Sequence, residues 1–147
     1  SLGLDKYRVE RAALLHDIAK NMDINKIKDI VKEHYREFIN EDINILHQYV
    51  GEYIAREDFF VYDDEILKSI KYHTTGRSNM SLLEKLIYVS DKIEPTRKYD
   101  TSKLFKECIK NFDNGFKKVL ITNKNYLTSK NVKITNSDTL NCYDYYL

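Results

Sequence analysis

The sequence predicts an all-α fold in a single domain. Its 147 residues amount to about one domain and are enough to bury one core. Only four glycines and one proline occur, whereas Leu, Ile, Lys, Glu and Asp are plentiful. Apolar residues recur at three- to four-residue spacing along most of the chain, which is the period of amphipathic helices. We therefore expect a helical bundle.

The first expected helix runs from about Asp5 to Lys20. Val9 and Ala12 share one face of it with His16, so His16 and the adjacent Asp17 are expected to face the core. Burying two such hydrophilic side chains is costly unless they are paired or bound, and a metal ion is the simplest partner. An isolated His-Asp pair is more often part of a solvated face, so other residues have to support a site.

Two amphipathic helices follow. The second is expected to begin at an N-cap near Asp23, and its stripe is Ile27, Ile30, Val31, Tyr35 and Phe38. The third comes after residues 40–42, and its stripe is Ile43, Leu46, Val50 and Ile54. His47 lies on the flank of that stripe. Gly51 costs this helix about 1 kcal/mol relative to alanine, which indicates that a neighbour approaches closely there.

The fourth and fifth expected helices each end in a polar residue at a position patterned for burial. The fourth starts at residues 63–65, and its stripe is Ile66, Ile70 and His73. Ser81 to Glu84 has the form of a capping box that opens the fifth, whose stripe is Leu83, Ile87 and Asp91. The Glu94-Pro95 pair ends that helix, and Arg97 follows close to Asp91.

The remaining chain reads as scaffold. One long helix is expected beyond residues 100–102, marked by Leu104, Phe105, Cys108, Phe112, Phe116, Val119 and Leu120. Residues 128–136 are polar and irregular. A last short helix over residues 138–147 is expected to dock by Leu140, Tyr143 and Leu147, with an N-cap at Ser137 or Asp138.

Composition excludes several classes of function. The net charge is +1 and no basic block stands out, so a nucleic-acid partner is not expected. No apolar run approaches the roughly 20 residues needed to cross a membrane, and the start lacks a signal-peptide core. Cys108 and Cys142 are too few for a disulfide framework, so the reducing cytoplasm is expected. The oligomeric state stays open, with a homodimer among the alternatives.

The polar residues of four different helices point to one site. They are His16 with Asp17, His47, His73 and Asp91. Repeated exceptions to apolar patterning on separate helices indicate convergence on one centre between them. Mixed imidazole and carboxylate ligands suit Fe, Mn, Co or Zn better than Ca, and carboxylates can bridge two ions. A metal-dependent hydrolase is the leading hypothesis.

Four segments carry a resemblance to a known family. They are ALLHDIAK from Ala13, HQYVG from His47, YHTTG from Tyr72, and YVSDKIEP-x-R from Tyr88 to Arg97. With them, nearly the whole chain resembles the HD-domain metal-dependent phosphohydrolases, specifically the bacterial YqeK type. The resemblance implies an HD-domain bundle and symmetrical hydrolysis of diadenosine tetraphosphate to two ADP molecules.

Site roles follow from the same resemblance. It implies that His16, Asp17 and Asp91 bind the metal, with one or two ions, iron first and Mn, Co, Zn or Mg as alternatives. It places a further histidine ligand one helix earlier, so we expect residues 1–147 to form an HD domain that lacks its first helix. His47 and His73 are implied to approach the substrate phosphates or to bind a second ion.

Phosphoanhydride chemistry requires the same residue types. A bound metal lowers the pKa of water from 15.7 toward about 7 and so supplies a nucleophile at neutral pH, which Asp17 or Asp91 can orient. Charge on the phosphoryl oxygens requires cationic groups, for which Lys20, Arg97 and protonated His47 or His73 are the candidates. We therefore assign catalytic roles to Asp17, Lys20, His47 and His73.

A tail segment completes the predicted nucleotide site. It is similar to a family segment that lies over the nucleotide, and its residues are Ile134, Thr135, Asn136, Ser137, Asp138 and Thr139. A helix N-cap explains the same residues equally well. Two other functions stay open: hydrolysis of a different nucleotide, and a nucleotide-sensing module without turnover.

Overall fold

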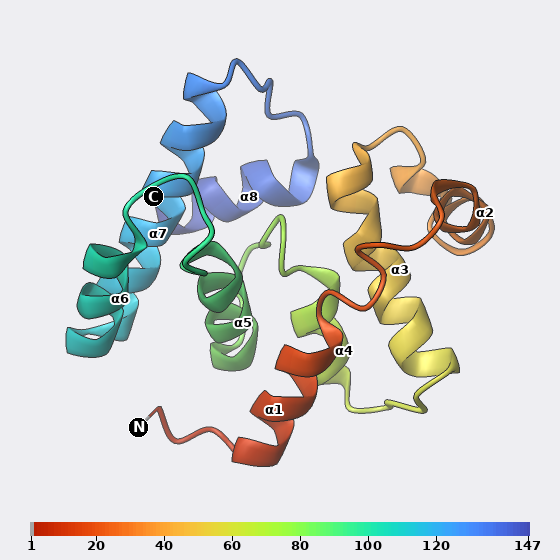
Figure 1. The fold of residues 1–147 in the computed structure, drawn as a ribbon, viewed down its shortest axis with the longest axis horizontal. Helices are drawn as coiled ribbons and strands as arrows, with labels where there is room; N and C mark the ends of the chain where they lie inside the picture. The colour runs from red at the N-terminus through yellow and green to blue at the C-terminus, as the bar shows by residue number, and fades with distance from the viewer. Residues whose placement is uncertain (1) are drawn as a thin grey trace.

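The computed structural model describes residues 2–147, which form eight α-helices, one 3₁₀-helix and no strand. The helices are α1 (Lys6–Leu15), α2 (Ile24–His34), η1 (Arg36–Phe38), α3 (Ile43–Glu57), α4 (Asp64–Lys71), α5 (Leu82–Lys92), α6 (Thr101–Lys110), α7 (Phe112–Ser129) and α8 (Ser137–Tyr146) (Figure 1). The all-α prediction is therefore confirmed. Within these residues, no helix is both long and apolar enough to cross a bilayer.

The first helix is shorter than predicted. It ends at Leu15, and the chain continues from His16 in tight turns with hydrogen bonds from Ile18 N to Leu15 O (3.1 Å) and from Lys20 N to Asp17 O (3.0 Å). These turns bury Ala19 against α2 and α3, a contact that a continuous helix would carry away from them. The expectation of a helix to Lys20 was therefore wrong, and the His16-Asp17 pair lies just beyond a helix end.

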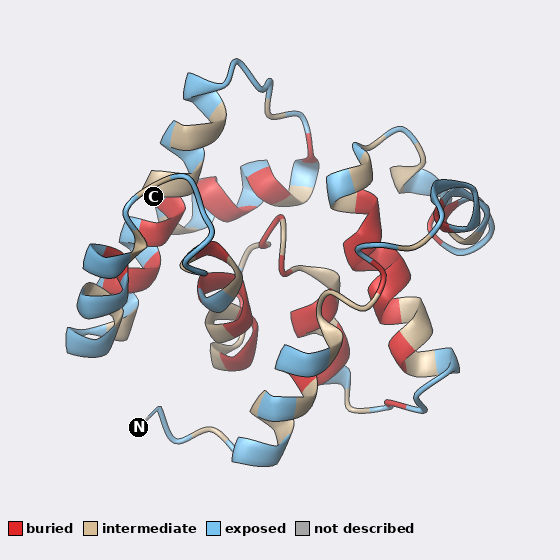
Figure 2. Ribbon diagram, in the orientation of Figure 1, coloured by how far each residue is buried: buried red, intermediate tan, exposed pale blue. Residues whose placement is uncertain are grey.

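Helix α3 has more buried residues than any other described helix. It carries eight buried residues and packs between α2 and α4, as the red segments of Figure 2 show. A Cβ on Gly51 would lie 3.2 Å from Ile70 Cγ2 and 3.6 Å from the His16 carbonyl oxygen. The predicted close approach at Gly51 is confirmed, and it brings α4 and the turn after α1 against the same stretch of α3.

Helices α4 and α5 are bounded largely as the sequence predicts. Asp63 caps α4, and the capping box of Ser81 and Glu84 opens α5. The last regular residues are Lys71 and Lys92, so His73 lies in the turn beyond α4 and Asp91 in the final turn of α5. Both helix ends lie beside the turn that follows α1, since His73 Nε2 is 3.3 Å from Asp17 Oδ1 and Asp91 Oδ1 is 3.7 Å from His16 Nε2.

The predicted long sixth helix is two helices. Asn111 between them is extended (φ −154°, ψ 110°), and its side chain caps α7 by accepting from Asn114 N at 3.0 Å. The chain reverses there, so α6 and α7 pack side by side, and Gly115 lies against the backbone of Cys108. Apolar spacing continues across Asn111, which is why periodicity alone did not reveal the break.

The last helix docks differently from the prediction. Its N-cap is Asn136, not Ser137 or Asp138, and its side chain accepts from Thr139 N at 3.0 Å. Cys142 and Tyr143 are buried, whereas Leu140 and Leu147 are 43% and 51% exposed. The expectation that Leu140 and Leu147 anchor the helix was therefore wrong. Cys142 and Tyr143 pack instead against Val89 of α5 and Phe116 of α7, in one buried cluster.

Candidate active site

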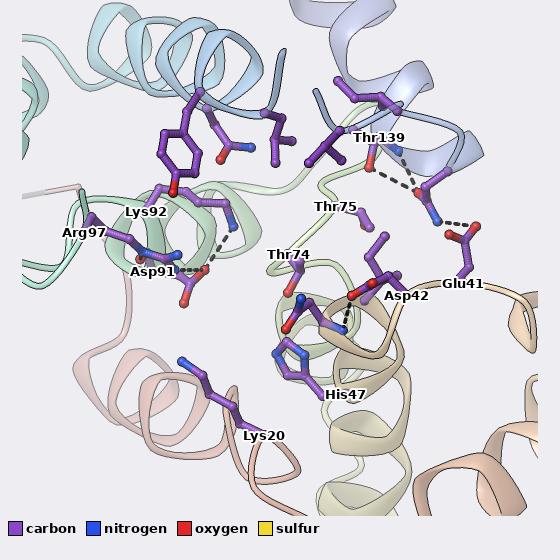
Figure 3. A pocket seen from close by; sticks show the side chains of 18 of the residues that line it. Lys20, Glu41, Asp42, His47, Thr74, Thr75, Asp91, Lys92, Arg97 and Thr139 are labelled. Carbon is purple, nitrogen blue, oxygen red and sulfur yellow. Dashed lines mark hydrogen bonds and ion pairs between the residues drawn. The ribbon is translucent and has the colours of Figure 1, made fainter. Parts of the chain in front are cut away.

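A cavity of about 670 Å³ lies where the turn after α1, the start of α3, the end of α5 and the loop before α8 meet. Figure 3 shows Asp91, Lys92 and Arg97 on one side of this cavity and His47 opposite them, with Lys20 below. Glu41 and Asp42 form its rim near Thr139. Charged side chains thus line the cavity on several sides.

The first possible ligand group joins the predicted metal residues. His16 Nε2 lies 3.4 Å from Asp17 Oδ2 and 3.7 Å from Asp91 Oδ1. One ligand atom from each residue falls within 4.8 Å of the others. The structure therefore brings together the turn after α1 and the end of α5, and these three residues can hold one metal ion.

A second group shares Asp17 with the first. His47 Nε2 and His73 Nε2 lie 3.5 Å and 3.3 Å from Asp17 Oδ1 and 3.0 Å from one another. His47 comes from the first half of α3 and His73 from the turn after α4. Asp17 offers one oxygen to each group, so the arrangement can also hold two ions with a bridging carboxylate.

The donor geometry fits a transition metal. His73 Nδ1 lies 2.7 Å from Ile70 O and His16 Nδ1 lies 2.6 Å from Ala13 O. A carbonyl only accepts, so each Nδ1 carries a proton and each ring turns Nε2 toward the carboxylates, as in many metal-binding histidines. Bonds of about 2.1 Å to one ion place donor atoms about 3.0 to 3.4 Å apart, close to the separations observed here.

Electrostatics favour a positive charge at this position. Burial disfavours protonation of His16, but the hydrogen bond to Asp91 and the charge of Asp17 outweigh it and raise the pKa of His16. Burial likewise opposes ionisation of Asp91, yet Lys92 and His16 hold its pKa well below the usual range. Burial lowers the pKa of His73, which keeps that ring neutral. A site with two ionised carboxylates and a neutral imidazole is suited to a cation.

The two predicted phosphate-binding cations lie at the same end of the cavity. Lys20 Nζ is 3.8 Å from Asp17 Oδ2, and its side chain is largely exposed. Arg97 donates from Nη2 to Asp91 Oδ2 and from Nε to Asp91 O, each at 3.0 Å. The predicted proximity of Arg97 to Asp91 is confirmed, and both cations border the ligand groups.

The tail segment is only partly in the cavity wall. The lining residues from it are Ile134, Thr135, Asn136 and Thr139. Ser137 and Asp138 do not line the cavity, because the chain turns there into α8. Asp138 instead accepts from the Tyr49 hydroxyl at 3.5 Å, and Asn136 donates to Glu41 at 3.0 Å. Nucleotide contact by this segment stays a prediction.

Two buried polar residues near the site were missed by sequence reasoning. Gln48 accepts from Thr74 N and Thr75 N at 3.0 Å and 3.3 Å, so it fixes the turn that carries His73. Lys92 contacts both that turn and Asp91. Its spacing of four residues from Tyr88 places it on the buried face of α5, which was a signal available in the sequence.

Comparison with known proteins gives a consistent assignment. Residues 1–96 match the family model described as HD domain. The chain is 34% identical to a symmetrical bis(5'-nucleosyl)-tetraphosphatase of Halalkalibacterium halodurans, over 97% of this chain and 77% of the relative. The same enzyme of Staphylococcus aureus is 33% identical, over 97% and 75%.

A solved structure supports the fold. The crystal structure of a predicted HD superfamily hydrolase involved in NAD metabolism from Clostridium acetobutylicum superposes with a TM-score of 0.84. The two chains are 29% identical, and the match covers 97% of this chain and 77% of the other.

Proposed function

Because this chain belongs to the HD-domain family, we propose that it is a metal-dependent phosphohydrolase that cleaves diadenosine tetraphosphate symmetrically into two ADP molecules. The observation that carries the proposal is the convergence of five His and Asp side chains in two groups that share Asp17. Three of the five, Asp17, His47 and Asp91, line the cavity. The two relatives that span most of the chain act on this class of substrate by name.

The metal ligands in this proposal are His16, Asp17 and Asp91. When bound, a divalent ion supplies an activated water and offsets the charge of the phosphates. Mixed nitrogen and oxygen donors favour a transition ion, and we put iron first, with Mn, Co, Zn or Mg as alternatives. The pair His47 and His73 either holds a second ion or approaches the phosphate oxygens.

The reaction breaks the central P–O–P bridge of the tetraphosphate. Water adds to one of the two central phosphorus atoms, and the other half leaves as ADP, so both products are the same. Asp17 and Asp91 orient the attacking water, while Lys20 and Arg97 offset the charge that spreads over the phosphoryl oxygens. The wall that includes Ile134, Thr135, Asn136 and Thr139 holds the nucleoside part of one half.

The compartment of the protein is proposed from its cysteines. Cys108 and Cys142 are both free thiols, which agrees with a reducing compartment, and we place the protein in the cytoplasm. A small nucleotide is the only partner that the proposal requires.

Elemental analysis and product analysis test the function. We expect purified full-length protein to carry a divalent transition ion and to release ADP as the only nucleotide from diadenosine tetraphosphate. Release of ATP and AMP would contradict symmetrical cleavage. Calorimetric binding of ADP by the metal-loaded protein, without turnover, would favour the nucleotide-sensing alternative.

A further inference from the structure

Lys92 is a buried cation at the end of α5. Its side chain is 5% exposed, and Lys92 lies beside the predicted ligand Asp91 at the wall of the cavity. Nζ donates to His73 O at 2.9 Å and to Asp91 Oδ2 at 3.0 Å. The centre of the Tyr88 ring lies 4.3 Å from Nζ. Two hydrogen bonds and one cation–π contact thus account for the three N–H groups of the ammonium.

A lysine in this position is costly. Taking an ammonium out of water costs several kcal/mol, and a methionine of similar length would pack there without that cost. The backbone of the same residue is held as well, since Lys92 O accepts from the Tyr99 hydroxyl at 2.7 Å. Both the backbone and the side chain of Lys92 thus have hydrogen-bond partners, and the charge of the side chain acts on Asp91 and on the His73 carbonyl.

The contact with Lys92 gives the two carboxylate oxygens of Asp91 different partners. Oδ2 accepts from Lys92 Nζ and from Arg97 Nη2, each at 3.0 Å (Figure 3). Oδ1 points to His16 Nε2, 3.7 Å away. A carboxylate held in this way offers one oxygen to an ion beside His16, because its other oxygen is already paired with two cations.

The second contact of Lys92 links the two ligand groups. His73 belongs to the group with His47, whereas Asp91 belongs to the group with His16. The ammonium bridges the His73 carbonyl and the Asp91 carboxylate, so it sets where the turn after α4 lies relative to the end of α5. Gln48 holds the same turn from the α3 side. No other described side chain bonds to both His73 and Asp91 in this way.

We infer that Lys92 is a positioning residue for the metal centre: it restricts Asp91 to ligation through one oxygen and keeps His73 in register with it. The inference rests on the proposed function, because it concerns the same metal site. It adds a residue that touches neither substrate nor metal but governs the geometry of those that do.

Substitution of Lys92 by methionine tests the inference, with Co²⁺ as the probe. The d–d absorption of Co²⁺ reports ligand number and geometry, whether or not the protein turns over substrate. We expect Lys92→Met to shift this spectrum. At saturating metal, kcat should fall about 10- to 100-fold while KM for diadenosine tetraphosphate stays within about twofold, as for other residues that orient ligands.

Lys85→Met is the matched control. Lys85 lies on the same helix, its Nζ lies 5.4 Å from the Phe116 ring centre, and its carboxylate partner Asp113 is 3.9 Å away. It does not line the cavity. The control should keep the wild-type spectrum, kcat and KM. If Lys92→Met does not fold, Lys92→Gln takes its place, since its side chain is one bond shorter and carries no charge, and it should give the same shift.

The possible outcomes distinguish failure of the proposed role of Lys92 from failure of the proposed hydrolase function. A wild-type Co²⁺ spectrum and kcat in the folded Lys92 variant would overturn the role of Lys92 and leave the proposed hydrolase intact. A rise in KM with unchanged kcat and spectrum would also overturn it, because Lys92 would then be contacting substrate. If wild-type full-length protein binds no Co²⁺, the metal centre itself is wrong and the inference falls with it.

Discussion

His47 Nε2 and His73 Nε2 face one another at 3.0 Å, with Asp17 Oδ1 within 3.5 Å of both. Two neutral imidazoles cannot both point lone pairs at such a distance without a proton or a cation between them. Because His73 is buried and donates Nδ1–H to Ile70 O, its Nε2 is an acceptor. Without an ion, His47 Nε2 can donate to this acceptor; with an ion, both nitrogens can bind it, and Asp17 provides the negative charge that the ion would balance.

Asp17→Asn should abolish metal binding and turnover together. Asp17 contributes an oxygen to both ligand groups, so its loss affects each of them. Loss of residues that only orient ligands already costs about 10- to 100-fold, and loss of a shared ligand should cost more than about 100-fold in activity. Elemental analysis and ADP release measure both effects. The exposed Asp144→Asn is the control, and a metal-replete, active Asp17→Asn protein would contradict the site.

Arg97→Lys should weaken nucleotide binding by about tenfold, or about 1.4 kcal/mol. Arg97 uses two guanidinium nitrogens on Asp91 and is 36% exposed toward the cavity, so it can also present its planar fork to phosphate. Lysine keeps the charge but not the fork. Calorimetry with ADP measures the change, and exposed Arg36→Lys should bind as the wild type does. Equal affinity in Arg97→Lys would remove Arg97 from the phosphate site.

Glu84→Gln should destabilise the fold while leaving the site chemistry in place. Glu84 is buried and accepts from Arg77 Nε at 2.6 Å, from Arg77 Nη2 at 2.9 Å and from Ser81 N at 2.7 Å. Breaking a buried ion pair of this kind costs about 3 to 5 kcal/mol, because the guanidinium loses its partner. Urea unfolding measures this loss in the free energy of unfolding. Glu107→Gln removes an exposed pair with Lys118 and should leave stability near the wild type.

Asp63 should make stability fall at acidic pH. Arg8 donates to both Asp63 oxygens, at 2.7 Å and 2.8 Å, and this bond lowers the pKa of Asp63. A lowered folded-state pKa contributes stability above the unfolded value of about 3.9, and that contribution is lost as pH falls through the folded value. We expect wild type to lose more stability than Asp63→Asn between pH 7 and pH 3 in urea unfolding. Asparagine is also a good N-cap for α4, so equal losses would exclude this pair as the cause.

Gly115→Ala should destabilise the α6–α7 pair by about 1 to 3 kcal/mol. A Cβ there would lie 2.5 Å from Cys108 Cα and 2.7 Å from Cys108 N, which are backbone atoms that cannot rotate away. The gain of about 1 kcal/mol in helix propensity does not offset that overlap. Thermal unfolding measures the change, with exposed Lys117→Ala as the control. A raised melting temperature would mean that α6 and α7 pack less closely than described.

Local signals in the sequence determined most of the helices. Asp23 and the capping box of Ser81 and Glu84 each act within three residues of a helix start, so their effect can be read without tertiary structure. Gly51 likewise indicated a close approach before the neighbour was known. The polar residues at apolar positions pointed to a site, because a core position that carries His or Asp requires a partner wherever it lies.

Only the tertiary structure decided where the chain leaves helical geometry and which groups meet. The end of α1 at Leu15 depends on burying Ala19 against α2 and α3, and the break at Asn111 depends on packing α6 against α7, so neither changes the local apolar period. The contact between His47 and His73 joins residues 26 positions apart. Lys92 bonds both to the neighbouring residue Asp91 and to His73 in the turn after α4. Such pairings depend on how the helices pack against one another, and a pattern with a period of 3.6 residues does not encode that packing.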